Sequence, residues 1–282
     1  MPSDPLQHFF DKNGQRLSAV AEKFGAYQPQ PVTRSTLWDW LRQVEPQDYE
    51  LLIRLAECVH YYDVPGMSMA LRQLHRAIRD QLIADGIPQI RRMVFVPPGE
   101  PGESGHEILR RYRNVNSLQQ TSARLKLVPQ LQEVVVEAQE ASEGLAVIFL
   151  DDFVGTGDQI ERYWREVLVQ VIPPPLPALY IGTIAACDEG VIKVQSATPL
   201  KVIPVHFTPA VAHLRTCPRF TDAEKDRLRQ YCGAIGNQPF GYGNLELLLA
   251  FTHGSPDNTI SLLRGAKGQR KWKGILPGYS DL

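Results

Sequence analysis

The most constraining feature of the sequence is the stretch AVIFLDDFVGTGDQI, residues 146–160. Its apolar run is typical of a strand buried on both faces of a parallel sheet. Residues 158–172 behind it have the apolar spacing of an amphipathic helix. Between the two lie the adjacent carboxylates Asp151 and Asp152 and a glycine-rich turn. Strand, turn and helix in this order predict a βαβ unit of a parallel α/β sheet.

More segments of the same kind surround this stretch. Residues 99–113 have the composition of a glycine-rich loop that runs into a helix. Short apolar segments predict strands near residues 91–98, 177–187, 200–207 and 244–254. We therefore expect residues 87–282 to form an α/β domain.

The N-terminal part of the chain has helical spacing throughout. Residues 33–44, 45–62 and 66–86 carry apolar side chains at intervals of three and four, which is the pattern of amphipathic helices. The expected organisation is a helical N-terminal subdomain over residues 1–86, followed by the α/β domain.

Composition limits the partners and the location of the protein. The formal net charge is −1, so contact with nucleic acid or a membrane has to come from a local patch. No stretch approaches the roughly 20 apolar residues of a membrane helix. The four cysteines are far apart in the sequence, which favours buried thiols in a reducing compartment. We expect a soluble cytoplasmic protein with no membrane contact.

The two acids and the turn together suggest a ligand site. Ligands of open α/β sheets bind beyond the carboxyl ends of the strands, where Asp151 and Asp152 are expected. The turn Gly155-Thr156-Gly157 offers backbone N–H groups to a phosphate, and carboxylates suit ribose hydroxyls or Mg²⁺. This series favours a nucleotide or sugar-phosphate site. The alternative is that the acids and glycines only form a tight turn.

The same stretch resembles the PRPP-binding signature of type I phosphoribosyltransferases, where PRPP is 5-phosphoribosyl 1-pyrophosphate. That signature is an apolar strand, two acids and a small Thr/Gly-rich loop. By this resemblance Asp151 and Asp152 are the catalytic acids, hold the ribose hydroxyls and have Mg²⁺ near them as the cofactor. The loop for the 5′-phosphate comprises Val154, Gly155, Thr156, Gly157, Asp158 and Gln159. The loop for the pyrophosphate comprises Pro98, Gly99, Ser104 and Gly105.

Three arginines follow the first loop on the next predicted helix. Arg110, Arg111 and Arg113 are candidates for neutralising the charge of a departing pyrophosphate. The alternative for each of them is an ordinary solvated helix face.

A longer resemblance spans residues 35–265. The stretches WDWLRQVEPQDYELLIRLAECVHYY, DDFVGTGDQ and FGYGNLELLLAFTHGSPDNTISLL resemble the phosphoribosyltransferase-like proteins of bacterial conflict systems. Those proteins are associated with anti-phage operons, including some retrons. The resemblance implies an antiviral effector with a protein partner from the same operon, a reverse transcriptase or a regulator. It also implies that five residues lie near the same ligand: Gly241, Tyr242, Gly243, Asp257 and Asn258.

The loop departs from the usual signature at two positions. Asp158 and Gln159 stand where glycine and then threonine or serine are usual. An aspartate facing a phosphate would repel it at short range. Either Asp158 turns away as a helix N-cap, or the loop binds something other than an ordinary 5′-phosphate.

Two other functions remain open at this level. An S-adenosylmethionine-dependent methyltransferase also has a strand, an acid, a glycine loop and a helix, and its next strand ends in an acid, as this chain does at Asp188 and Glu189. Its glycine pattern does not match, because Phe153 and Val154 stand where a glycine is expected. A non-catalytic nucleotide sensor on the same fold is the other alternative. We expect an enzyme of the glycosyltransferase class.

A basic segment near the C-terminus is a candidate for binding single-stranded nucleic acid. Its charges surround Trp272, and basic residues beside an aromatic ring can hold a strand by charge and stacking. The basic residues are Arg264, Lys267, Arg270, Lys271 and Lys273. A simply solvated segment is the alternative.

Overall fold

The computed structural model describes residues 4–86, 92–99, 104–118, 125–140, 144–172, 178–236, 238–265 and 272–278. The chain forms two compact units. One unit is Gly66–Thr208, and the other combines Met1–Pro65 with Pro209–Leu282. These bounds differ from the expected division at residue 86, because the last N-terminal helix packs on the sheet.

Gly66–Thr208 is built on a five-stranded parallel sheet in the order β3-β2-β4-β5-β6. This arrangement confirms the predicted parallel α/β class. Val96 at the end of β2 pairs with Phe149, and β4 continues beyond this level to Val154. The strands are β2 (Arg92–Val96), β3 (Leu125–Leu127), β4 (Leu145–Val154), β5 (Ala178–Ala186) and β6 (Lys201–Phe207).

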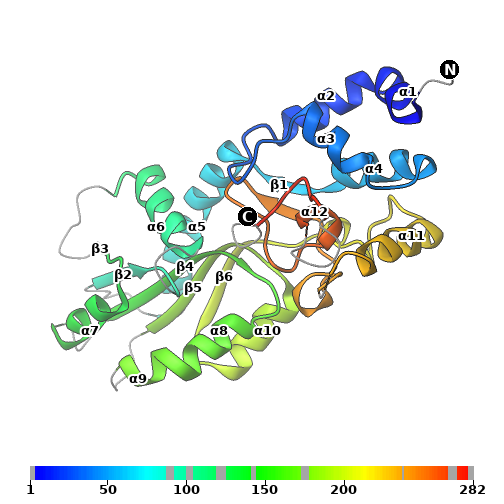
Figure 1. The fold of residues 1–282 in the computed structure, drawn as a ribbon. Coiled ribbons are helices and arrows are strands. Elements are labelled where there is room, and N and C mark those ends of the chain that lie inside the picture. Colours follow the sequence, from blue (N-terminus) through cyan, green and yellow to red (C-terminus); the bar gives the residue numbers. More distant parts are fainter. Residues whose placement is uncertain are drawn as a thin grey trace. The chain divides into compact units, whose positions relative to one another are not determined.

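Helices cover both faces of this sheet (Figure 1). On one face, Leu74 and Ile78 of α5 approach Gly182 of β5, and Tyr112 of α6 lies 5.0 Å from Phe95 of β2, between ring centroids. The other face forms a core with α8 and α10, shared by residues such as Phe149, Ile160 and Val194. The helices are α5 (Val64–Ala84), α6 (Ser104–Val115), α7 (Leu131–Glu140), α8 (Asp158–Tyr163), α9 (Val169–Val171) and α10 (Asp188–Ala197).

The amphipathic segment after β4 is a helix with an irregular centre. A π-helix, η2 (Trp164–Leu168), separates α8 from α9. Ile160 and Leu168 are buried against the sheet, as predicted from their spacing, and Val169 is exposed.

The other unit is mainly helical and shares one core between its N- and C-terminal parts. The indole Nε1 of Trp40 donates to the carbonyl oxygen of Leu262 at 2.9 Å. Its N-terminal elements are α1 (Pro5–Lys12), α2 (Gly14–Lys23), α3 (Arg34–Leu41), η1 (Pro46–Asp48), α4 (Tyr49–Cys58) and β1 (His60–Tyr62). Its C-terminal elements are η3 (Ala210–Ala212), α11 (Asp222–Gly233), η4 (Tyr242–Asn244), β7 (Leu249–Phe251) and α12 (Ser261–Arg264).

The strand expected near residues 244–254 is present but does not join the main sheet. It is β7, which pairs in parallel with β1 through His60 and Leu249. Across the described residues, no helix combines the length and the apolar character that a membrane span requires.

Candidate functional site

The candidate site lies where the order of the strands reverses. From β2 the chain moves outward to β3, then returns to β4 on the other side of β2 and continues to β5 and β6. Ligands of such sheets bind beyond the carboxyl ends of the strands at this switch point. Asp151 and Asp152 lie on the part of β4 that extends past Val96, within the strand rather than after its end.

Asp151 is a buried carboxyl group held by two donors. Its side chain is 6% exposed, and its Oδ1 accepts hydrogen bonds from the Ser104 hydroxyl and from the backbone N–H of Asp152, both at 2.9 Å. Burial raises the pKa of Asp151 well above its usual value, and the negative charge of Asp152 raises it further. Asp152 itself is half-buried. A buried carboxyl beside a more open one can accept hydrogen bonds from neighbouring hydroxyls of one ligand.

The start of α6 is packed directly against the end of β2. A Cβ built on Gly105 would lie 2.9 Å from Cδ of Pro98 and 3.2 Å from the carbonyl oxygen of Leu150. Gly99 has a φ of 80°, the left-handed region that favours glycine. The structure therefore brings Ser104 and Gly105 of the predicted pyrophosphate loop to Asp151. Residues 100–103 of that loop lie outside the described residues.

The predicted phosphate loop packs against the start of α10. Gly157 has a φ of 81°, and a Cβ on it would lie 2.8 Å from the carbonyl oxygen of Gly190. A Cβ on Gly190 would lie 2.1 Å from the carbonyl oxygen of Gly155. Real Cβ atoms do not approach so closely, so this backbone contact requires glycine at position 190.

The charge of Asp158 is balanced within the site. Asp158 is the first residue of α8, and Gly157 takes the N-cap position that was expected for Asp158. The Thr156 hydroxyl donates to Oδ2 of Asp158 at 2.7 Å, and the Lys193 ammonium of α10 pairs with Oδ1. Lys193 also lies 3.1 Å from Oε2 of Glu161. Gln159 is exposed.

Lys193 is a residue of this site that sequence reasoning missed. Hydrogen bonds from Lys193 to Asp158 and then Glu161 raise its pKa above the usual lysine value. The only signal in the sequence is its position, three residues after Gly190 on the helix that follows the next strand.

Two of the predicted arginines already have a carboxylate partner. Arg110 and Arg111 both pair with Glu107 of the same helix, each at 2.7 Å. Arg113 is exposed. The role of the three arginines in neutralising pyrophosphate stays a prediction. The negative charge of Glu107 would offset part of the positive charge of Arg110 and Arg111.

The five C-terminal site candidates lie in the other unit and contact one another. The N–H of Tyr242 donates to the carbonyl oxygen of Asp257, and Nδ2 of Asn258 donates to that of Tyr242, both at 2.8 Å. A Cβ on Gly241 would lie 2.1 Å from the carbonyl oxygen of Asn258. Gly243 has a φ of 66°. Their proximity to the two acids stays a prediction.

The basic C-terminal segment does not present an aromatic ring for stacking. Trp272 is 9% exposed and its Nε1 donates to the carbonyl oxygen of Leu262 at 3.0 Å. Arg264 is buried and pairs with Asp257 at 2.7 Å. Lys267, Arg270 and Lys271 lie outside the described residues. A nucleic-acid contact at this segment stays a prediction without support from Trp272.

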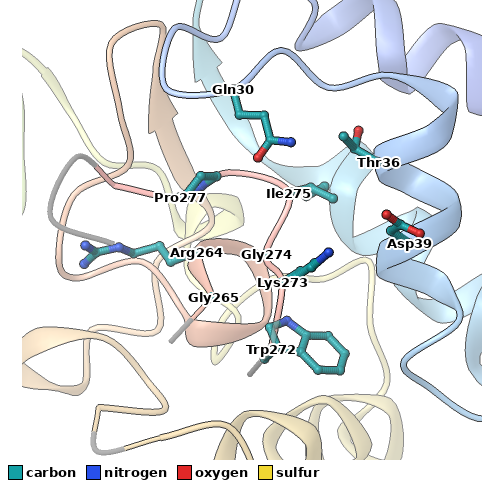
Figure 2. Close-up of a pocket in the computed structure, with 10 residues that line it drawn as sticks. All are labelled: Gln30, Thr36, Asp39, Arg264, Gly265, Trp272, Lys273, Gly274, Ile275 and Pro277. Atoms are coloured by element: carbon teal, nitrogen blue, oxygen red, sulfur yellow. The ribbon is translucent and has the colours of Figure 1, made fainter. Parts of the chain in front are cut away.

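A cavity of about 270 Å³ lies beside this segment, between α3 and the end of the chain (Figure 2). In Figure 2 the Arg264 side chain is directed away from Thr36 and Asp39. The cavity contains none of the residues predicted to bind PRPP. Its lining residues are Gln30, Thr36, Asp39, Arg264, Gly265, Trp272, Lys273, Gly274, Ile275 and Pro277.

Asp151 and Asp152 fit a Mg²⁺ site in which a substrate supplies some of the ligands. Among the described residues, no group of three or more His, Cys, Asp or Glu side chains could hold a metal without other ligands. Mg²⁺ is commonly bound through one or two carboxylates together with substrate phosphates and water. Asp151 and Asp152 supply donors of this kind, so they fit such a shared site.

A family model described as PRTase-CE matches residues 37–277, which is most of the chain. No curated protein and no solved structure matches the chain significantly. The match covers the acids of β4, the glycine loop and the segments around Tyr242 and Asn258.

Proposed function

The chain belongs to the PRTase-CE family and is phosphoribosyltransferase-like, and on that premise we propose that it binds PRPP or a related ribose phosphate together with Mg²⁺. The ligand lies at Asp151 and Asp152, with its 5′-phosphate in the loop of residues 154–159. The protein transfers or cleaves at the C1′ atom of the ribose.

One observation carries the proposal. Asp151 is buried at the switch point of the sheet, beside Asp152, and is hydrogen-bonded by Ser104 from the start of α6. Burying an ionisable carboxyl costs folding free energy. Perturbed carboxyl groups of this kind cluster at functional sites.

The chemistry follows from the two ends of the ligand. The bond from C1′ to the pyrophosphate oxygen breaks, the pyrophosphate keeps the electron pair, and positive charge develops on the ribose. A nucleophile, which is the acceptor in a transfer or water in a cleavage, then forms the new bond to C1′ and loses its proton. Mg²⁺, when bound, supplies charge neutralisation at the pyrophosphate. The acids hold the 2′- and 3′-hydroxyls, and the negative charge of Asp152 stabilises the cationic ribose. Ser104 fixes the orientation of Asp151.

The biological role that we propose is an effector of an anti-phage defence system. It rests on the resemblance to conflict-system proteins, and it includes a protein partner from the same operon, a reverse transcriptase or a regulator. Phage plating on cells that carry the operon tests it. Asp151→Asn with Asp152→Asn removes protection if ligand chemistry at this site is the effector activity.

Ligand class is tested by thermal unfolding of the full chain with a panel of compounds. PRPP and ribose 5-phosphate with Mg²⁺ are expected to raise the unfolding temperature, because a ligand that binds only the native state stabilises it. S-adenosylmethionine is expected to give no shift. A shift with S-adenosylmethionine that Asp188→Asn with Glu189→Gln removes would favour the methyltransferase alternative and contradict the proposal.

Catalysis is tested separately by phosphorus NMR of PRPP with Mg²⁺ and the protein. Release of pyrophosphate supports an enzyme. Binding without release, with the partner protein present, would favour the non-catalytic sensor on the same fold.

A further inference from the structure

The loop of residues 154–159 contains a charge that an ordinary phosphate site lacks. Asp158 begins α8, and the Thr156 hydroxyl, a donor suited to a phosphate, points at its Oδ2. Two like charges a few ångströms apart repel, and they repel more strongly at a protein surface than in bulk water because the effective dielectric is lower there. An unbalanced Asp158 would therefore weaken phosphate binding.

Lys193 is fixed beside this charge by the backbone. Gly190 of α10 touches the carbonyl group of Gly155, and Lys193 follows three residues later. Residues three apart on a helix share a face, so the close contact at Gly190 brings Lys193 to the loop. Its ammonium contacts Asp158 and Glu161 while its side chain stays 40% exposed.

We propose that Lys193 neutralises Asp158 and thereby makes the loop of residues 154–159 able to accept a phosphate. The proposal rests on the proposed function. Lys193 acts through Asp158, so it is a positioning residue that sets specificity for the phosphorylated end of the ligand.

The alternative role for Lys193 is a structural ion pair between α8 and α10. An exposed ion pair of this kind contributes little to stability. If the role were purely structural, loss of Lys193 would change the unfolding temperature slightly. It would leave the ratio of the affinities for ribose 5-phosphate and for pyrophosphate unchanged.

The experiment measures dissociation constants by calorimetry for two probes, ribose 5-phosphate and inorganic pyrophosphate with Mg²⁺. Lys193→Met is expected to weaken ribose 5-phosphate binding by about tenfold, because the positive charge that contacts Asp158 and Glu161 is then lost. Lys193→Arg keeps the charge and is expected to bind within about threefold of the wild type. Pyrophosphate binding, which belongs to the start of α6, is expected to stay unchanged in both.

A double variant tests whether the weaker binding in Lys193→Met is caused by the charge of Asp158. Asp158→Asn with Lys193→Met removes both charges and is expected to restore ribose 5-phosphate binding to within about threefold of the wild type. The double variant has the same net charge as the wild type, so it can still be measured if Lys193→Met alone fails to fold.

Three results would overturn the proposal while leaving the proposed function intact: wild-type affinity in Lys193→Met, equal losses for both probes, or no recovery in the double variant. A wild-type protein that binds neither probe would overturn the proposed function and this inference with it.

Discussion

The Ser104 hydroxyl at the start of α6 donates a hydrogen bond of 2.9 Å to Oδ1 of Asp151 in β4. This bond joins the loop after β2 to the acid of β4, and those two strands flank the switch point of the sheet. It links the segment proposed for pyrophosphate to the segment proposed for ribose. Orientation of Asp151 therefore depends on Ser104.

Removing this hydroxyl is expected to weaken ligand binding. A hydrogen bond between neutral groups contributes about 0.5–1.5 kcal/mol, so Ser104→Ala is expected to raise the dissociation constant of PRPP by about two- to tenfold. Ser104→Thr retains a hydroxyl, so its dissociation constant for PRPP is expected to lie between those of the wild type and of Ser104→Ala. Isothermal titration calorimetry measures both. Unchanged affinity in Ser104→Ala would contradict the role given to this bond.

Asp151→Asn is expected to stabilise the ligand-free protein while removing PRPP binding. The amide can accept the same two hydrogen bonds without a buried charge. Because the folded-state pKa of Asp151 is raised, the native state keeps its proton where the unfolded state has lost it. Wild-type stability therefore falls as pH rises from the usual aspartate value through the raised pKa.

The measurement is urea unfolding of both proteins without Mg²⁺ at pH 4 and pH 7. The advantage of the Asn variant is expected to be larger at pH 7. An advantage that is absent, or that shrinks toward pH 7, would show that burial of Asp151 does not cost stability.

The backbone contact between the loop and α10 is expected to tolerate no side chain. Gly190→Ala places a Cβ 2.1 Å from the carbonyl oxygen of Gly155, so the loop has to move. We expect a loss of about 2 kcal/mol or more in the free energy of unfolding, together with weaker PRPP binding.

A matched control is Gly233→Ala at the end of α11. A Cβ there meets no atom within 4 Å. This variant is expected to be neutral or to gain up to about 1 kcal/mol, because alanine restricts the unfolded chain. Similar denaturant midpoints for the two variants would contradict the tight contact at Gly190.

Lys23 gives the helical unit a pH dependence of its own. Its ammonium donates to the carbonyl oxygens of Glu57, in the last turn of α4, at 3.0 Å and of Val59, just after α4, at 2.7 Å. Burial lowers the pKa of Lys23 to about 8. Above that pH the native state has lost the proton while the unfolded state keeps it up to the usual lysine pKa.

Stability of the wild type relative to Lys23→Met is therefore expected to rise between pH 8 and about pH 10.5. Chemical denaturation across this range measures the difference. A difference that stays constant with pH would contradict the burial of the charged amine.

The sheet and the place of the two acids were predictable from local pattern. The apolar run before Asp151 has the length and composition of a central strand, and the structure makes it β4. The extension of β4 past β2 was not predictable, because register depends on the neighbouring strand. It moves the acids from behind the strand into its last part.

The grouping of helices was not predictable, because an amphipathic pattern shows that a face is buried and does not show what covers it. Residues 66–86 have the same spacing as the helices before them, yet Leu74 and Ile78 pack at Gly182 of the sheet. Trp40 meets Leu262 from a distant part of the chain. Lys193 reaches the site through the backbone contact of Gly190, which only the folded chain contains.

The central claim is that Asp151 and Asp152 bind a ribose phosphate with Mg²⁺. It is tested by isothermal titration of Mg²⁺ and PRPP into three proteins. These are the wild type, the double variant Asp151→Asn with Asp152→Asn, and a control double variant, Asp188→Asn with Glu189→Gln. The control removes two acids that are exposed at the start of α10. Saturable binding to the wild type and the control is expected, and none to the variant without the acids of β4. Equal binding to all three proteins, or binding to none, would contradict it.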